Sequence, residues 1–118
     1  MSASRNLGVG HACGRYVAFL DADDVWMLGK LAEQCAILDA RPDCGMVYGR
    51  TLIWRSWDAE GEDFLYPLGV EPDAVYAPPR LFELLVENKA QSPTTCNALM
   101  RRALIEEVGG FEAGFRSM

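Results

Sequence analysis

The stretch Arg15–Trp26, RYVAFLDADDVW, decides how the rest of the chain is interpreted. Its first part, Tyr16–Leu20, is a run of aromatic, β-branched and aliphatic residues, which predicts a buried strand. Three carboxylates follow at once, those of Asp21, Asp23 and Asp24, before an apolar pattern of helical spacing begins. Acids at the carboxyl end of a strand are typical of ligand sites in open α/β sheets.

The pair Asp21 and Asp23 predicts a metal and phosphate site. In extended backbone, side chains two residues apart point to the same side. Two hard oxygen donors on one side suit Mg²⁺ or Mn²⁺, with the phosphates of a ligand completing the coordination shell. The structural alternative makes both residues turn formers. For Asp24 we expect the structural role, as the N-cap of the following helix.

The spacing of apolar residues predicts alternating helices and strands, which is the pattern of an α/β fold. Helices are expected over 2–13, 25–40, 80–87 and 103–108, and strands over 15–20, 46–54 and 94–101. The first helix and the strand after it predict half of a parallel α/β unit. The acidic segment 56–72 is expected to be a loop, with a short hairpin around 59–61. The stripe expected to be buried in helix 25–40 is Val25, Leu28, Leu31, Ala32, Cys35 and Leu38.

Composition places the chain among globular proteins and excludes some partners. It has 118 residues, of which 50% are hydrophobic and 24% charged, which suits a single domain. The formal net charge of -6 gives no basic surface for neutralising phosphates along a duplex, so we expect no nucleic-acid partner. An anionic nucleotide would need a bridging cation. No apolar run is long enough for a membrane span.

The cysteines give no sign of a zinc site. None of Cys13, Cys35, Cys44 and Cys96 stands in CxxC spacing, and His11 is the single histidine. Cys13 and Cys35 fall on apolar stripes and are expected to be small core residues. We expect reduced thiols and a cytoplasmic location, with peripheral attachment to the inner face of the cell membrane as an alternative.

An ordered set of motifs resembles the family 2 glycosyltransferases of the GT-A fold. Its members are Ser4-Arg5-Asn6 and Gly8, Ala12 and Gly14, Tyr16–Asp24 with Trp26, Lys30-Leu31 and Gln34, Val47-Tyr48-Gly49, Arg101-Arg102, and Val108-Gly109-Gly110-Phe111. A DxD triplet alone is a weak motif, whereas this ordered set is specific and covers nearly the whole chain. The resemblance implies a partial GT-A (Rossmann-like) mixed sheet flanked by helices, with residues 1–118 as a single partial domain. Leu28 and Gly29 depart from the family pattern, which usually has Pro and Glu there.

The resemblance also implies a reaction, the transfer of a sugar from a nucleoside-diphosphate-sugar donor to a hydroxyl of a saccharide or lipid-linked acceptor. Asp21 would then lie near the donor's ribose or sugar, and Asp23 would ligate Mn²⁺ or Mg²⁺ on the diphosphate. The cation would stabilise the negative charge that the departing diphosphate gains. Arg5 and Asn6 would point to the nucleotide side of the site, or else be a helix-surface arginine and a locally bonded asparagine.

Two parts of the family pattern are not found in the sequence. One is the opening strand and loop that bind the nucleotide base, and the other is the Glu-Asp pair that supplies the usual catalytic base. Glu112 matches an acidic position before that pair, so we do not assign it as the base. We therefore expect a central fragment of the transferase domain that is inactive alone. We also expect it to form a homo-oligomer, through a sheet edge or a swapped element that covers apolar surface.

Two other functions fit some of the same residues. Asp21, Asp23 and Val25 also fit the DxDx(T/V) start of haloacid-dehalogenase-like phosphatases, in which the first Asp is a nucleophile. That family needs a later lysine and an acidic pair at a strand end, whereas Glu106-Glu107 falls in a predicted helix. The remaining alternative is a non-catalytic oligomeric remnant or binding module.

Overall fold

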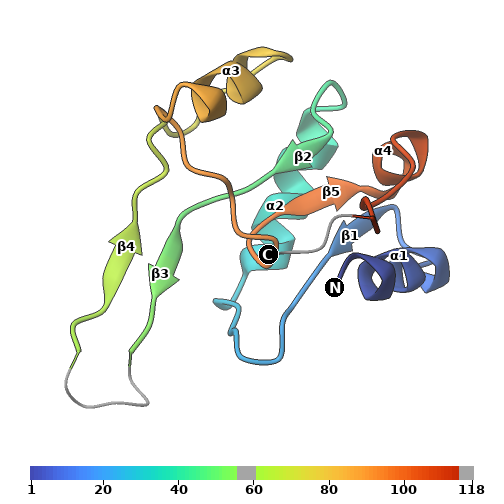
Figure 1. Ribbon diagram of the computed structural model, residues 1–118, viewed down its shortest axis with the longest axis horizontal. Helices are drawn as coiled ribbons and strands as arrows, with labels where there is room; N and C mark the ends of the chain where they lie inside the picture. Colours follow the sequence, from blue (N-terminus) through green and yellow to red (C-terminus); the bar gives the residue numbers. More distant parts are fainter. Residues whose placement is uncertain (56–60, 115–118) are drawn as a thin grey trace.

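The computed structural model describes residues 1–55 and 61–114 as an α/β fold, as the sequence predicts. The elements in order are α1 (Ser2–His11), β1 (Tyr16–Ala18), α2 (Lys30–Ala40), β2 (Met46–Val47), β3 (Thr51–Ile53), β4 (Phe64–Tyr66), α3 (Arg80–Val86), β5 (Leu99–Arg101) and α4 (Arg102–Glu107). Figure 1 shows α1 and α4 close together beside the sheet of β1, β5 and β2, while the β3–β4 hairpin extends away from it.

The central sheet has the order β1-β5-β2, and β5 runs antiparallel to both neighbours. Met100 of β5 lies opposite Val17 of β1 on one side and Met46 of β2 on the other. β1 and β2 therefore point in the same direction but are not paired with each other. The ladders described are antiparallel because a late strand of the chain is inserted between the two early ones. That α1 and β1 form half of a parallel α/β unit stays a prediction.

Helices cover both faces of this sheet. Met100 packs against a buried cluster that joins α1, β1 and α4. The members of this cluster are Val9, Val17 and Ile105. Arg101 follows Met100 and points to the opposite face, where its guanidinium donates to the Leu38 carbonyl oxygen of α2 at 2.6 Å. The sheet thus lies between α1 and α4 on one face and α2 on the other, which agrees with the predicted sheet flanked by helices.

Helix α2 begins five residues later than predicted, at Lys30, and its N-cap is Gly29 rather than Asp24. Gly29 has φ 84°, a left-handed conformation that separates the helix from the residues before it. The expected buried stripe is wrong at its start as a consequence, since Val25 and Leu28 are 70% and 101% exposed, whereas its last member, Leu38, is buried. The side chains that α2 buries are Gln34 and Leu38, which lie four residues apart on one face.

The strand expected over 46–54 is divided in two. β2 belongs to the central sheet, and β3 pairs antiparallel with β4 in a separate hairpin. The division lies at Gly49 and Arg50, whose carbonyl oxygens both accept hydrogen bonds from the Asn97 side-chain amide, at 2.8 and 2.7 Å. Those bonds replace ladder partners at the break. β4 lies inside the segment predicted to be a loop. The antiparallel pairing of β3 with β4 agrees with the hairpin expected around 59–61, of which residues 59 and 60 lie outside the described residues.

The predicted bounds of some helices and strands are confirmed and others are wrong. Helices α3 and α4 lie within one residue of their predicted bounds, but β5 is shorter than predicted because residues 95–97 form a turn. Cys13 is exposed rather than buried, because α1 ends at His11 and Ala12 is already extended, with φ -69° and ψ 131°. Cys96 is the buried cysteine.

Candidate active site

The acids after β1 lie on a turn rather than on extended backbone. The Asp24 N–H donates to the Asp21 carbonyl oxygen at 3.1 Å, so that Ala22 and Asp23 form the corner of the turn. Asp21 and Asp23 therefore do not lie side by side as the extended geometry predicts. In the parts of the chain that the structure describes, the exposed Asp23 carboxylate makes no hydrogen bond or ion pair.

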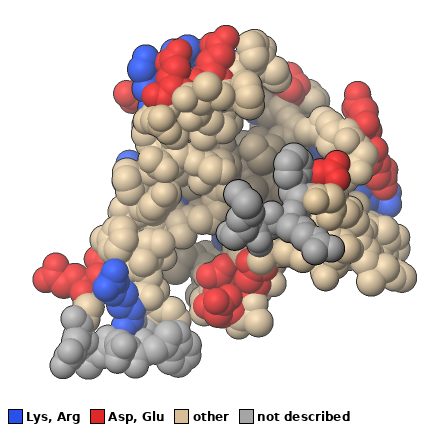
Figure 2. All heavy atoms as spheres, in the orientation of Figure 1, with Lys and Arg blue, Asp and Glu red and all other residues tan. Residues whose placement is uncertain are grey.

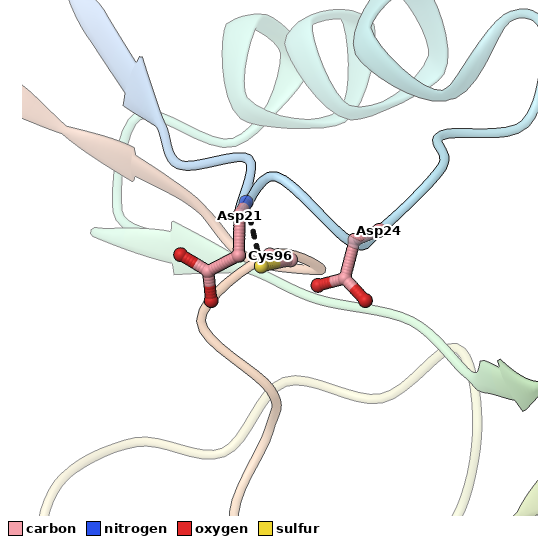
Figure 3. Close-up of side chains that lie close together, drawn as sticks. All are labelled: Asp21, Asp24 and Cys96. Atoms are coloured by element: carbon pink, nitrogen blue, oxygen red, sulfur yellow. Dashed lines mark hydrogen bonds between the residues drawn. The ribbon is translucent and has the colours of Figure 1, made fainter.

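The turn brings Asp24 close to Asp21, with Cys96 beside both. One ligand atom from each of these three side chains lies within 4.8 Å of the others. Figure 3 shows the two carboxylates and the thiol gathered at the turn, with the Asp21 N–H donating to the Cys96 sulfur at 3.4 Å. Two carboxylates are exposed and the thiol is buried, so a ligand arriving from solvent meets oxygen atoms first.

The Cys96 thiol is a poor ligand for the ions that the carboxylates favour. Burial raises the pKa of this thiol to about 12, and a hydrogen bond to the Asp24 carboxylate acts in the same direction. The thiol is therefore protonated at neutral pH, and Mg²⁺ and Mn²⁺ prefer oxygen ligands over sulfur. The donor set at the turn, exposed carboxylates in a chain of negative net charge, fits a hard divalent cation.

Arg5 of α1 reaches this site. Its guanidinium lies 3.5 Å from the Asp21 carboxylate, and its side chain is 17% exposed. The rings of Phe19 and Phe111 lie 5.8 and 5.9 Å from the guanidinium carbon, so aromatic contacts hold the charge in place. Two of the four residues predicted for the site, Arg5 and Asp21, are thus in direct contact.

Asn6 has a structural partner in the chain. Its side-chain amide donates to the Phe111 carbonyl oxygen and accepts from the Phe111 N–H, both at 2.8 Å. The pair of bonds fixes the segment after Gly110, which has φ 79°, against α1. A donor-binding role for Asn6 stays a prediction, and the local hydrogen bonding weighed as its alternative is present.

Sequence reasoning missed the segment Cys96-Asn97, which lies beneath the acidic turn. The Trp26 indole N–H donates to the Cys96 carbonyl oxygen at 2.8 Å, and the Gln34 amide donates to the Asn97 carbonyl oxygen at 2.7 Å. A glutamine four residues before Leu38, on the same helix face as that apolar residue, is the sequence signal that would have pointed to this contact.

The side chains of Arg101 and Arg102 donate hydrogen bonds to carbonyl oxygens at the ends of two helices. Arg101 donates to the carbonyl oxygens of Leu38 and Arg41 at the end of α2, at 2.6 and 3.0 Å. Arg102 donates to the Ala12 carbonyl oxygen after α1 at 3.0 Å. Both side chains thus satisfy carbonyl groups that the helices leave open.

Among the described residues, Arg5 is the basic side chain that forms an ion pair with an acid of the turn. Figure 2 shows several groups of acidic side chains on one face of the molecule and fewer basic ones. A separate apolar hollow of about 260 Å³ lies between the sheet and α4, and its lining includes none of the acids of the turn. An anionic ligand at the turn therefore needs a cation to offset the carboxylates.

Comparison with known proteins supplies the family. Residues 1–109 match the family described as Glycosyl transferase family 2. The chain belongs to this family. The assignment confirms the resemblance seen in the sequence, and it leaves the phosphatase interpretation without support. Family members commonly use a divalent metal, and their donors are nucleotide sugars.

One relative is an Escherichia coli protein named UDP-Glc:alpha-D-GlcNAc-diphosphoundecaprenol beta-1,3-glucosyltransferase WfgD. It is 35% identical to this glycosyltransferase-family chain over 48 residues. The match spans 41% of the chain and only 19% of the relative's length. No solved structure matches the chain. No described helix is long and apolar enough to cross a membrane.

Burial of Cys96 has a chemical consequence. At pH 8 we expect iodoacetamide to label the exposed Cys13 and to leave Cys96 unlabelled, because the pKa of about 12 keeps the Cys96 thiol protonated. Peptide mass spectrometry of the folded and the urea-unfolded chain measures both sites. Unfolding should expose Cys96 to the reagent, and rapid labelling of Cys96 in the folded chain would contradict its placement beneath the turn.

Proposed function

We propose that the chain is part of a glycosyltransferase of polysaccharide synthesis that uses Mn²⁺ or Mg²⁺ at Asp21 and Asp23. The reaction moves a sugar from a nucleoside-diphosphate-sugar donor to an acceptor hydroxyl. The observation that carries the proposal is the turn after β1, on which the carboxylates of Asp21, Asp23 and Asp24 are all exposed, in a chain of family 2. We assign no catalytic base, so we expect the chain studied alone to bind donor nucleotide without turnover.

Each acid has a separate role in this proposal. Asp23, exposed at the corner of the turn, ligates the cation that binds the donor diphosphate. Asp21, held by Arg5, lies near the ribose or the sugar and adds a second oxygen ligand. Asn6 completes the nucleotide side of the site. When bound, the divalent cation would offset the negative charge that the diphosphate gains as it leaves.

The partners follow from the family and the relative. The relative's name gives UDP-Glc as its donor and a lipid-linked sugar as its acceptor, so UDP is the first donor nucleotide to test. The acceptor class is a saccharide, free or lipid-linked. We propose a cytoplasmic protein, peripheral to the inner face of the membrane where the acceptor is lipid-linked. The four free thiols suit a reducing compartment.

The metal site can be tested by thermal unfolding of the chain with Mn²⁺ and a panel of nucleoside diphosphates. Binding at 100 times Kd stabilises a folded protein by about 2.7 kcal/mol, which raises Tm by several degrees. We expect a metal-dependent rise with one nucleotide, and we expect Asp23→Ala to abolish it because the variant lacks the cation ligand.

The matched control for this loss of charge is Glu107→Ala, which removes an exposed carboxylate at the end of α4. It should keep the full rise in Tm. An equal rise in Asp23→Ala would overturn the role of Asp23. No rise for any metal and nucleotide pair would contradict the proposed function and favour a non-catalytic remnant.

We also propose that the chain self-associates. β1 and β2 each have an outer edge with no strand partner among the described residues, and unpaired edges favour pairing with another chain. Apolar side chains of α4 and of the residue after it add to this surface, with Leu104 38% and Val108 69% exposed. Light scattering at micromolar concentration should give at least twice the chain mass of 13.1 kDa. A compact monomer would refute the oligomer.

A further inference from the structure

The segment Cys96-Asn97 is hydrogen-bonded to the acidic turn, Asp21–Asp24, through the Cys96 side chain. The Asp21 N–H donates to the Cys96 sulfur at 3.4 Å, and Cys96 is only 8% exposed. Any shift of this segment therefore moves the hydrogen-bond acceptor of the first acid of the turn. Its position is set by groups that lie outside the turn, since Trp26 and Gln34 donate to its two carbonyl oxygens.

Gln34 is fixed in one orientation by Lys30. The Lys30 ammonium, which has donors only, lies 2.8 Å from the Gln34 side-chain oxygen. The amide nitrogen must then point the other way, toward the Asn97 carbonyl oxygen at 2.7 Å. The Lys30 ammonium is itself held over the Trp26 ring, 4.6 Å from its centroid. Gln34 is 7% exposed, so this bond is shielded from water.

The side chain of Asn97 links the Cys96-Asn97 segment to the start of the β3–β4 hairpin. Its side-chain amide donates to the Gly49 and Arg50 carbonyl oxygens, and its side-chain oxygen accepts from the Gly49 N–H at 3.3 Å. The segment is thus anchored on the β2–β3 junction as well as on α2. The contact from Gln34 is the one that places it against the helix following the acidic turn.

We infer that Gln34 is a positioning residue for the proposed metal and nucleotide site, acting through the main chain of Cys96-Asn97 on the turn that carries Asp21. This inference rests on the proposed function. Residues that orient metal ligands without touching the metal alter affinity when they are replaced, typically by about 10-fold to 100-fold. Gln34 has the burial and the directed hydrogen bonds of such a residue.

Two substitutions remove the bond to the Asn97 carbonyl oxygen and differ in charge. Gln34→Glu keeps the size and the contact with Lys30 but replaces the donor with an acceptor. Gln34→Met removes the donor without adding charge. Gln34→Met adds no charge, so a loss of binding that both variants share is not an effect of the added carboxylate.

Trp26 provides the readout. In a chain that also carries Trp54→Phe and Trp57→Phe, Trp26 is the single tryptophan, and its indole donates to the residue beside the acids. Mn²⁺ bound with UDP at the turn should quench its fluorescence. A titration with Mg²⁺, which does not quench, separates quenching from a change in structure. Near-UV circular dichroism and Tm establish that each variant is folded at the temperature used.

We expect both Gln34 variants to raise the Mn²⁺ concentration for half-maximal quenching by about 10-fold to 100-fold. The matched control is Gln91→Glu, which makes the same chemical change at an exposed side chain that accepts from Tyr66. It should titrate as the parent chain does. Should one Gln34 variant not fold, the other decides.

The outcomes separate the two claims. Quenching in the parent chain with unchanged titrations in the folded Gln34 variants would overturn the role of Gln34 and leave the metal site intact. An equal loss in Gln91→Glu would also overturn it, because the effect would then not depend on position. Absence of quenching in the parent chain would overturn the proposed function and, with it, this inference.

Discussion

The structure depends on the insertion of β5 between β1 and β2. This strand comes from near the end of the chain, yet it pairs with two strands from the first half and places Met100 in the cluster with α1 and α4. This pairing also places Cys96, which precedes β5, next to the residues that follow β1. Cys96 meets Asp21 across 75 positions of sequence because of this pairing. Arg101, at the other end of β5, ties the strand to the last turn of α2.

Local patterns in the sequence predicted the elements better than their connections. β1, α3 and α4 were all predictable, from the apolar run of β1, from Pro78-Pro79 at the start of α3 and from Gly109-Gly110 after α4. The family motifs brought Arg5 and Asp21 into one prediction, and the structure places them in contact. Neither the local patterns nor the family motifs indicated Cys96. Its burial follows from the pairing of β5 with β1, and local sequence patterns do not predict which distant strands pair.

The start of α2 shows why the geometry of the acids was mispredicted. Helical spacing of apolar residues extends back to Val25, but the indole of Trp26 donates to the Cys96 carbonyl oxygen and Gly29 adopts a left-handed conformation. Long-range hydrogen bonding therefore outweighs local helical preference in this segment. The segment freed from the helix forms the turn that brings Asp24, rather than Asp23, close to Asp21.

The central claim is that the acidic turn, Asp21–Asp24, holds a cation while Cys96-Asn97 lies beside it and positions it. Paramagnetic line broadening by Mn²⁺ tests it most directly, in nitrogen-15 correlation spectra of the chain with UDP at substoichiometric metal. The account predicts that the amide signals of residues 21–24 and 96–97 broaden together and before all others. Broadening that begins at other exposed acids, such as Glu62 or Glu106, or that reaches 21–24 without 96–97, would contradict it.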